Sequence, residues 1–397
     1  MNFLCNLDYD ERHTINSILN ECIKKKVRVY LVGGAVRDII LGKTPKDIDI
    51  CLECNPMDII KYLREVMEYK YYERFQTSNI IFNNDVSIDL IRCRKEVYNY
   101  NGALPEVIPS GIYDDLHRRD FTINAIAYDI INQDFVDPFN GIEDIKSKII
   151  KSIHSNSYFE DPTRIFRAVR YSNRYAFNLE DIWDAKNAIK MNVFKSISND
   201  RIIREIVLMC KEEEWIKNIL MCKKLGIFSI DENKLNNNNS LCNYLEINNR
   251  ILNLFISLTS DEYREKFIDN SILDKELKTA FKNYTRLIEI IDRALSRNLS
   301  NYEIYCILNK LNVYGMRLLS FNKLAKYKVI NYMQNLQNNN LSVKGNYLTE
   351  LGIVEGKYIK YIFDILLNLR LNTGVLNDTK YLTSNLGEIL NAAKHKN

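Results

Sequence analysis

The feature that most constrains this chain is Leu31-Val-Gly-Gly-Ala-Val-Arg-Asp38, followed nine residues later by Asp47-Ile-Asp49. The β-rich run 27–32 predicts a strand that enters a Gly-Gly turn, and residues 35–41 predict a short helix that Gly42 can cap. The chain then returns through Pro45 to a second apolar strand. Alternate residues of a strand point to the same face, so we expect Asp47 and Asp49 to project together.

This combination predicts a site for a divalent cation and a phosphorylated ligand. Glycine lets phosphate approach the backbone N–H groups, which assigns that role to Gly33 and Gly34. Carboxylate oxygens are ligands that Mg²⁺ prefers, which assigns the metal to Asp47 and Asp49. Taken singly, a Gly-Gly turn is usually structural and an Asp-x-Asp strand is often a solvated edge. Their order and spacing together favour the site.

A second cluster of charged residues lies in Glu160-Asp-Pro-Thr-Arg-Ile-Phe-Arg-Ala-Val-Arg170. The spacing places Asp161, Arg164, Arg167 and Arg170 on one slowly drifting helix face, with Asp161 as the N-cap before Pro162. An ordinary solvated basic stripe would show the same spacing. A carboxylate accepts from the exocyclic amine of a base and arginine donates to ring acceptors, so Asp161 and Arg164 could imitate a Watson–Crick edge.

Four blocks in order carry a family resemblance. They are 33–38 with 47–49, Arg118-Arg-Asp-Phe-Thr-Ile-Asn-Ala-Ile-Ala-Tyr128, residues 160–170, and Asn199-Asp-Arg-Ile-Ile-Arg-Glu205. Together they resemble the class II nucleotidyltransferases of the DNA polymerase β superfamily, a group that contains tRNA CCA-adding enzymes and bacterial poly(A) polymerases. Residues 347–357 are similar to the tail of bacterial CCA-adding enzymes without a hydrolase domain, although Val354-Glu355-Gly356 stands where relatives usually have a Lys-Pro-Gly-type turn.

The resemblance implies an activity and a set of roles. It implies addition of CCA to tRNA 3′ ends from CTP and ATP, with two Mg²⁺ ions held by Asp47 and Asp49. Asp161 and Arg164 would select the base, and the triphosphate and sugar contacts would come from Arg37, Arg118, Arg167 and Arg170. Asp89 could be a third carboxylate or a surface residue of its strand. Asp38 and Arg119 are expected to hold the shape of the site by pairing locally.

The implied fold is an α+β nucleotidyltransferase head of the polymerase β type, followed by an all-α neck, body and tail. We place the head at 1–140, the neck at 141–212, the body at 213–275 and a basic tail at 276–397. Within the head we expect a helix near 57–69, strands at 79–82 and 86–92 joined by a hairpin turn, and a loop over 93–117.

Composition agrees with a soluble intracellular protein, which we expect in the cytoplasm. The resemblance implies tRNA as its macromolecular partner. No apolar run approaches the ~18 residues that span a bilayer, and nothing implies a protein partner. The nine cysteines form no disulfide-like pattern, so we expect reduced thiols. Residues 301–397 carry 12 Lys or Arg against 6 Asp or Glu, which suits contact with an RNA backbone, although a Lys- and Asn-rich composition would give the same excess.

Several alternatives share the head motifs. A CC-adding enzyme, an A-adding enzyme and a poly(A) polymerase would differ from a CCA-adding enzyme in loop length and tail geometry. A non-catalytic RNA-binding protein of the same fold would be expected to lose the aspartates that are present here. A nucleotidyltransferase acting on small molecules would not need the helical neck and the basic tail.

Overall fold

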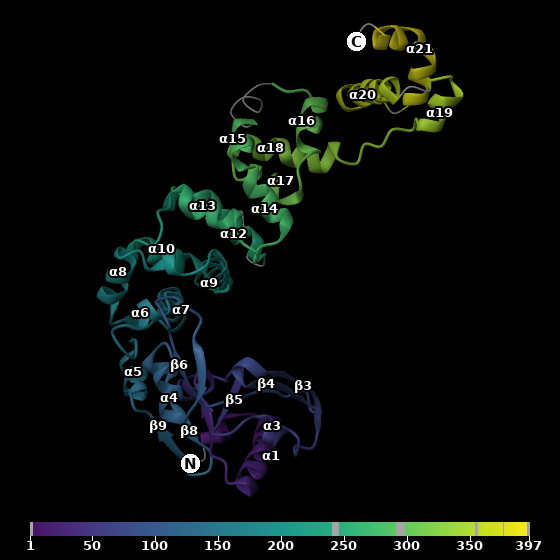
Figure 1. Ribbon diagram of the computed structural model, residues 1–397. Helices are drawn as coiled ribbons and strands as arrows, with labels where there is room; N and C mark the ends of the chain where they lie inside the picture. Colours follow the sequence, from purple (N-terminus) through teal and green to yellow (C-terminus); the bar gives the residue numbers. More distant parts are fainter. Residues whose placement is uncertain (1–2, 240–245, 291–297, 354–355, 376, 395–397) are drawn as a thin grey trace. The chain divides into compact units, whose positions relative to one another are not determined.

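The computed structural model describes residues 3–239, 246–290, 298–353, 356–375 and 377–394. The chain divides into two compact units, Met1–Ser229 and Ile230–Asn397 (Figure 1). The predicted α+β first part followed by helices is confirmed. The finer division into head, neck, body and tail stays a prediction, and Val354 and Glu355 of the tail motif lie outside the described residues.

A seven-stranded mixed sheet forms the centre of the first unit. In spatial order its strands are β3 (Val66–Tyr72), β4 (Thr77–Phe82), β5 (Ser87–Arg92), β2 (Ile48–Leu52), β1 (Val29–Val32), β8 (Ala127–Asp129) and β9 (Asp134–Val136). Strands β2 and β5 are parallel, whereas β2 and β1 are antiparallel. Two smaller pairs are β6 (Arg94–Val97) with β7 (Glu106–Pro109), and β10 (Ile149–Ile150) with β11 (Asn178–Leu179).

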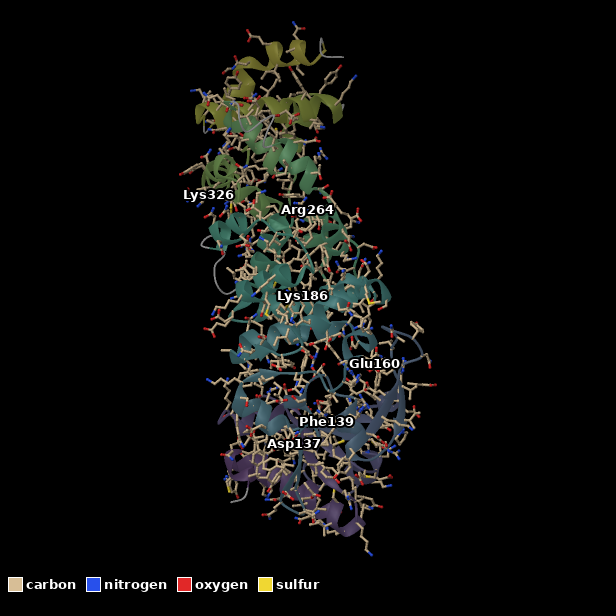
Figure 2. The ribbon with its side chains drawn as sticks, turned by 90° about the vertical axis from the view of Figure 1, so that its left-hand side faces the viewer. Asp137, Phe139, Glu160, Lys186, Arg264 and Lys326 are labelled. Atoms are coloured by element: carbon tan, nitrogen blue, oxygen red, sulfur yellow. The ribbon has the colours of Figure 1, made fainter. Side chains whose placement is uncertain are left out.

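In sequence order, helix α1 precedes the first strand of the sheet, and most of the chain after the last strand of the sheet is helical. They are α1 (Tyr9–Lys25), α2 (Gly34–Ile40), α3 (Met57–Ile60), α4 (Ile112–His117), α5 (Gly141–Ser147), α6 (Ser157–Glu160), α7 (Thr163–Tyr175), α8 (Ile182–Lys190), α9 (Asn199–Lys211) and α10 (Trp215–Leu225). Short 3-10 turns are η1 (Phe3–Asn6), η2 (Glu73–Phe75), η3 (Thr122–Asn124) and η4 (Val193–Ser196). The start of α5 is fixed by Asp137, which accepts the N–H groups of Gly141 and Ile142 and is labelled with Phe139 in Figure 2.

Two expectations about the head were wrong. The helix expected over 57–69 ends at Ile60, and Val66–Tyr72 forms the edge strand β3 because its β-branched and aromatic residues pair with β4. The segment 93–117, expected as a loop, contains the β6–β7 hairpin and α4. Pro109 is tolerated at the end of β7 because each strand of a two-stranded ribbon has one edge whose N–H groups pair with no neighbouring strand, and Pro has no N–H to donate. The hairpin of β4 and β5 is confirmed.

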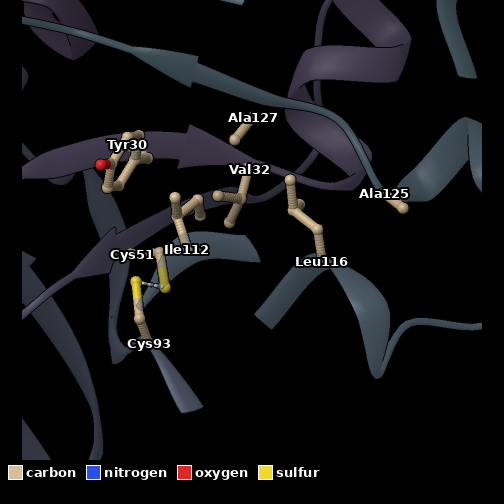
Figure 3. Packing of buried hydrophobic residues seen from close by; sticks show 8 residues of the cluster. All are labelled: Tyr30, Val32, Cys51, Cys93, Ile112, Leu116, Ala125 and Ala127. Carbon is tan, nitrogen blue, oxygen red and sulfur yellow. Dashed lines mark hydrogen bonds between the residues drawn. The ribbon is translucent and has the colours of Figure 1, made fainter. Parts of the chain in front are cut away.

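A buried cluster supports the strand that carries Asp49. It combines Tyr30 and Val32 of β1, Cys51 of β2, Ile112 and Leu116 of α4, and Cys93, Ala125 and Ala127 (Figure 3). The thiols of Cys51 and Cys93 point toward each other, as Figure 3 shows. Helix α4 therefore packs against β1 and β2, the two strands that carry the Gly-Gly turn and Asp49 at their ends near the site.

The second unit is helical in its described part. Its helices are α11 (Glu232–Asn239), α12 (Ile247–Ser257), α13 (Asp261–Ile268), α14 (Lys275–Lys282), α15 (Tyr284–Ile290), α16 (Asn301–Leu308), α17 (Val313–Ser320), α18 (Lys323–Asn331), a π-helical turn η6 (Tyr332–Leu336), α19 (Gly345–Glu350), α20 (Gly356–Thr373) and α21 (Asp378–Lys394). Its last helices share a core that includes Leu348, Ile362, Leu366 and Leu382. Among the described residues, no helix combines the length and apolar character that a bilayer crossing requires.

Candidate active site

Gly33 forms the turn between β1 and α2 and has a backbone that disfavours any other residue. Its φ of 67° and ψ of −124° fall in a region that side chains rarely adopt. A Cβ at this position would also overlap Nη1 of Arg119. Gly33 N–H donates to the carbonyl of Ile126 at 3.1 Å, so the turn is tied to the segment that leads into β8. The turn therefore needs glycine for both its conformation and its packing.

We expect Gly33→Ala to destabilise the protein more than Gly42→Ala. Gly42 has a similar φ of 70° but open space around its Cβ position, so it isolates the cost of the backbone conformation. That cost is about 1–2 kcal/mol, and displacement of Arg119 adds to it in Gly33→Ala. Urea unfolding of both variants measures the difference. Equal losses would show that the contact with Arg119 does not restrict this position.

Asp47 and Asp49 lie together at the start of β2, as predicted. Asp47 immediately precedes the strand and is exposed, whereas Asp49 is partly buried and stands opposite Asp89 of β5 in register. Burial raises the pKa of Asp49 to about 6; Arg119 opposes this rise, and Asp89 and Asp47 add to it. A carboxylate that burial and neighbouring negative charges make unfavourable is well placed to be stabilised by a cation.

The donor set fits Mg²⁺ in the way that this ion usually binds. Mg²⁺ is commonly held by one or two carboxylates, with substrate phosphates and waters completing the octahedron. Asp47 and Asp49 supply two such groups in an open cleft. No group of three or more His, Cys, Asp or Glu side chains suited to a metal occurs in the described part of the chain, so the site does not resemble an all-protein cage.

The pKa of Asp49 gives a testable effect on stability. An unfolded chain loses this proton near pH 3.8, whereas the folded metal-free protein keeps it until about pH 6, so stability falls as the pH rises between these values. In EDTA at pH 7 we expect Asp49→Asn to be more stable than the parent, on the order of 1–3 kcal/mol. The difference should vanish near pH 3.5. Thermal unfolding across this range measures it, and a pH-independent difference would refute the shift.

Three arginines near the glycine turn and at the start of the 118–128 block form ion pairs with acidic side chains. Arg37 donates to Asp38 at 2.8 Å and to Asn124, and it lies 4.8 Å from the ring of Tyr175. Arg118 and Arg119 both pair with Asp115, at 2.7 and 2.9 Å. The expectation that Asp38 and Arg119 pair locally is met.

Asp115 is the shared partner of Arg118 and Arg119, and the sequence analysis did not identify it. It is fully buried, and although burial opposes ionisation, Arg118 and Arg119 hold its pKa below the ordinary value. Glu96 of the β6–β7 hairpin also accepts from Arg118, at 3.2 Å. The spacing of Asp115 three and four residues before the arginines was a usable signal, because such pairs face each other on a helix.

Asp161 and Arg164 lie at the start of α7. The Asp161 carboxylate accepts the N–H of Thr163 at 3.0 Å and pairs with Arg201 at 2.7 Å. The prediction that Asp161 is the N-cap of this helix was wrong by one residue, because the N-cap of α7 is Pro162. Arg164 is buried and donates to Ser157 Oγ at 2.6 Å and to the carbonyl of Arg118 at 2.8 Å. Its guanidinium is thus fixed in orientation before any ligand binds.

Arg167 and Arg170 continue along the same face of α7. Arg167 Nε donates to Asp120 at 2.7 Å, and its side chain is one-third exposed. Arg170 is buried near Glu205 and Glu212, at 3.7 and 3.9 Å, and its Nε makes no hydrogen bond within the described residues. A buried donor without a partner is costly, so a ligand oxygen at this position would be favourable.

One cleft of about 1020 Å³ collects these side chains. Its lining contains all the site residues predicted from the sequence except Gly33, namely Gly34, Arg37, Asp47, Asp49, Arg118, Asp161, Arg164, Arg167 and Arg170. Asp89 is not in the lining, although it stands beside Asp49 on the sheet. The cleft therefore brings Asp47 and Asp49 into one lining with seven arginines and eight other acidic residues, several of which pair with those arginines.

Residues 29–151 match the family model of the poly A polymerase head domain. These residues have the fold of such a head domain. The solved structure of a CCA-adding enzyme (apo form II) superposes with a TM-score of 0.79 at 23% identity, covering 97% of this chain and 98% of that one. The Thermotoga maritima CCA-adding enzyme complexed with tRNA gives a TM-score of 0.71 at 22% identity, covering 98% and 97%. These likenesses establish the fold.

Curated relatives carry related activities. An A-adding tRNA nucleotidyltransferase of Aquifex aeolicus is 28% identical over 337 residues, which cover 78% of this chain and 41% of the relative. A CCA-adding enzyme of Lactobacillus helveticus is 34% identical over 185 residues, which cover 45% of each protein. Two further A-adding relatives are covered over 43% and 54% of their length, so the chain spans about half or less of these curated A-adding proteins.

Proposed function

We propose that this chain transfers nucleotides from CTP and ATP to the 3′ end of tRNA without a template, and that the full product is CCA. The observation that carries the proposal is the cleft in the first unit of the fold. In it, the carboxylates of Asp47 and Asp49, Gly34 of the Gly-Gly turn and the fixed pair of Asp161 and Arg164 line one cavity. The CCA-adding enzymes of the same fold support the choice of acceptor.

The residues divide the work by charge. Attack of an RNA 3′-hydroxyl on an α-phosphate builds negative charge on the attacking, equatorial and leaving oxygens. Two Mg²⁺ ions bound by Asp47 and Asp49 would favour ionisation of the hydroxyl and stabilise the leaving pyrophosphate. Arg37 and Arg118 would bind the triphosphate, and their fixed partners reduce the entropy lost when it binds.

Base selection would rest on Asp161 and Arg164. Ser157 and the Arg118 carbonyl hold the Arg164 guanidinium in one orientation, and Arg201 does the same for the Asp161 carboxylate. A fixed donor and a fixed acceptor can distinguish cytosine and adenine from uracil and guanine by hydrogen bonding. Arg167 and Arg170 would contact phosphate or sugar farther along α7.

We expect Arg164→Ala to lower the preference for CTP over UTP by about 10- to 100-fold, because the base would lose its donor. Single-nucleotide incorporation with each of the four triphosphates measures this preference. Arg164→Lys serves as the comparison, since it keeps the charge but not the planar fork. Equal losses with all four nucleotides in Arg164→Ala would assign the side chain to phosphate instead.

The direct test offers the full chain three tRNA transcripts, ending at the discriminator base, after C and after CC. Each receives labelled CTP, ATP or both, with Mg²⁺. Two C additions followed by one A establish CCA addition. Addition of A only to the CC end would establish A addition, the second candidate, which the A-adding relatives from three organisms favour. No incorporation into any transcript would refute transfer to tRNA.

A further inference from the structure

On one face of the sheet, a row of polar residues extends from Asp49 of β2 across β5 and β4 to the edge strand β3. In register, Asp49 of β2 stands opposite Asp89 of β5, Asp89 opposite Asn79 of β4, and Asn79 opposite Lys70 of β3. We name these four residues the carboxylate–lysine row. Neighbouring strands are about 4.8 Å apart, so the row extends about 14 Å from Asp49 to Lys70. One strand of nucleic acid advances about 3.4 Å per nucleotide when stacked, so this length can hold several nucleotides.

The row lies on the more exposed face of β3, β4 and β5, whereas the same face of β2 is covered by α4 beyond Asp49, at Cys51. On the opposite face, Ile80, Ile88 and Leu90 are fully buried. On the face of the row, Asn79 and Asp89 are partly exposed and Lys70 is exposed. An Asn79 amide donates to Asp89 at 2.8 Å, so the polar side chains form a connected surface. Period-two alternation thus separates a core face from a more exposed face that begins at the candidate metal site and that also carries Glu68, Ile81 and Ile91.

The outer end of the row combines cations with aromatic rings. Lys70 Nζ lies 5.2 Å from the centroid of the Tyr72 ring, and Tyr72 is 43% exposed. Next to it, Arg94 lies 5.8 Å from the Phe75 ring and donates to Thr77, which shares the face of Tyr72. Arg94 also pairs with Glu96 at 3.3 Å, and Glu96 lines the cleft. Cationic groups among exposed aromatic rings are typical of surfaces that bind single-stranded nucleic acid.

The topology also decides which reactant fits this face. Strand β2 lies between β1, which leads into the Gly33–Gly34 turn, and β5, which begins the row. Asp47 and Asp49 therefore stand between the turn proposed for the triphosphate and the outer residues of the row, Asp89, Asn79 and Lys70. In phosphoryl transfer the attacking and leaving oxygens are roughly in line on opposite sides of the phosphorus. The acceptor strand is thus the reactant expected on the side of β5.

We propose that the carboxylate–lysine row, with Tyr72, binds the 3′-terminal segment of the acceptor RNA strand as it approaches Asp49. Lys70 contacts a phosphate, and Tyr72 stacks on a base. This inference rests on the proposed function, because it takes the acceptor to be RNA. It adds β3 and β4, which carry none of the sequence motifs, to the binding surface.

The test compares two double variants of the full chain. Lys70→Ala/Tyr72→Ala removes the outer end of the row. Lys61→Ala/Tyr62→Ala is the matched control, because Lys61 Nζ lies 5.5 Å from the ring of the exposed Tyr62, beside α1 rather than on the row. We expect the first pair to raise the KM for tRNA about 10-fold or more with an unchanged KM for CTP, and the control to change neither. Thermal unfolding of both checks that they fold.

A binding measurement separates this inference from the proposed function. Anisotropy titration of a labelled tRNA transcript should show the same 10-fold loss for Lys70→Ala/Tyr72→Ala, and Lys70→Ala alone should flatten the salt dependence of log K by about one unit. If the parent binds tRNA but transfers nothing, the activity is refuted while the row is still tested by binding. Equal affinities for the parent and Lys70→Ala/Tyr72→Ala, or equal losses in both double variants, would overturn the inference.

Discussion

Replacing Asp49 with Asn should reduce nucleotide transfer by about 10³-fold or more, while tRNA binding changes less than about threefold. The substitution keeps the shape of the side chain and removes the charge that would hold Mg²⁺ beside the α-phosphate. Because Asp49 is partly buried among Asp47, Asp89 and Asp115, removing its charge relieves repulsion and should not unfold the head. Asp47→Asn should give a loss of the same kind.

The measurement is single-turnover transfer of one labelled nucleotide to tRNA, with binding followed separately by anisotropy. Asp58→Asn is the control, because Asp58 is an exposed aspartate of the same head with a single surface ion pair to Lys61. Transfer by Asp49→Asn near the parent rate would remove Asp49 from the reaction. A parallel loss of tRNA affinity would mean that the residue acts on the acceptor rather than on the metal.

The sequence predicted the parts of the site whose geometry is local. The Gly33 turn and the neighbouring aspartates of β2 each depend on a few adjacent residues, and turn chemistry and strand alternation specify them. The arginines of α7 follow from helical spacing in the same way. Their convergence on one cleft came from the family resemblance rather than from spacing, because it depends on how β2 and α7 pack together.

The sequence did not reveal the partners that come from distant segments. Glu96 lies on a hairpin that was expected to be a loop, because its glycines and prolines masked two short strands. Arg201 reaches Asp161 from forty residues away, a contact that no local pattern encodes. Strand β3 was taken for a helix, since short apolar runs suit either structure until a pairing strand decides. The carboxylate–lysine row depends on that strand and was therefore invisible.

The second large effect concerns the ion pair between Asp120 and Arg167, which joins the head to α7. Burial alone would raise the pKa of Asp120, but Arg167 and a hydrogen bond from Asn124 outweigh it and hold the pKa at about 2. Asp120 also accepts the N–H of Phe121 at 2.9 Å. Removing one member of such a pair leaves the other charge buried without its partner. Arg167→Ala would leave the buried Asp120 carboxylate without its counterion, so we expect this variant to lower the free energy of unfolding by about 3–5 kcal/mol.

A double-mutant cycle distinguishes this pair from ordinary packing. Asp120→Ala should cost less than Arg167→Ala, because the Arg167 side chain that it leaves without a partner is partly exposed. The double variant should cost less than the sum of the two. Since the Asp120 carboxylate ionises at a lower pH in the folded protein than in the unfolded chain, its contribution is present above about pH 4 and is lost as the pH falls toward 2. Additive losses in urea unfolding at pH 7 would show that the two side chains contribute independently. Coupling would mean that Arg167 is stabilised by Asp120 before substrate binds, with its exposed edge turned to the cleft where a phosphate or sugar is proposed to lie.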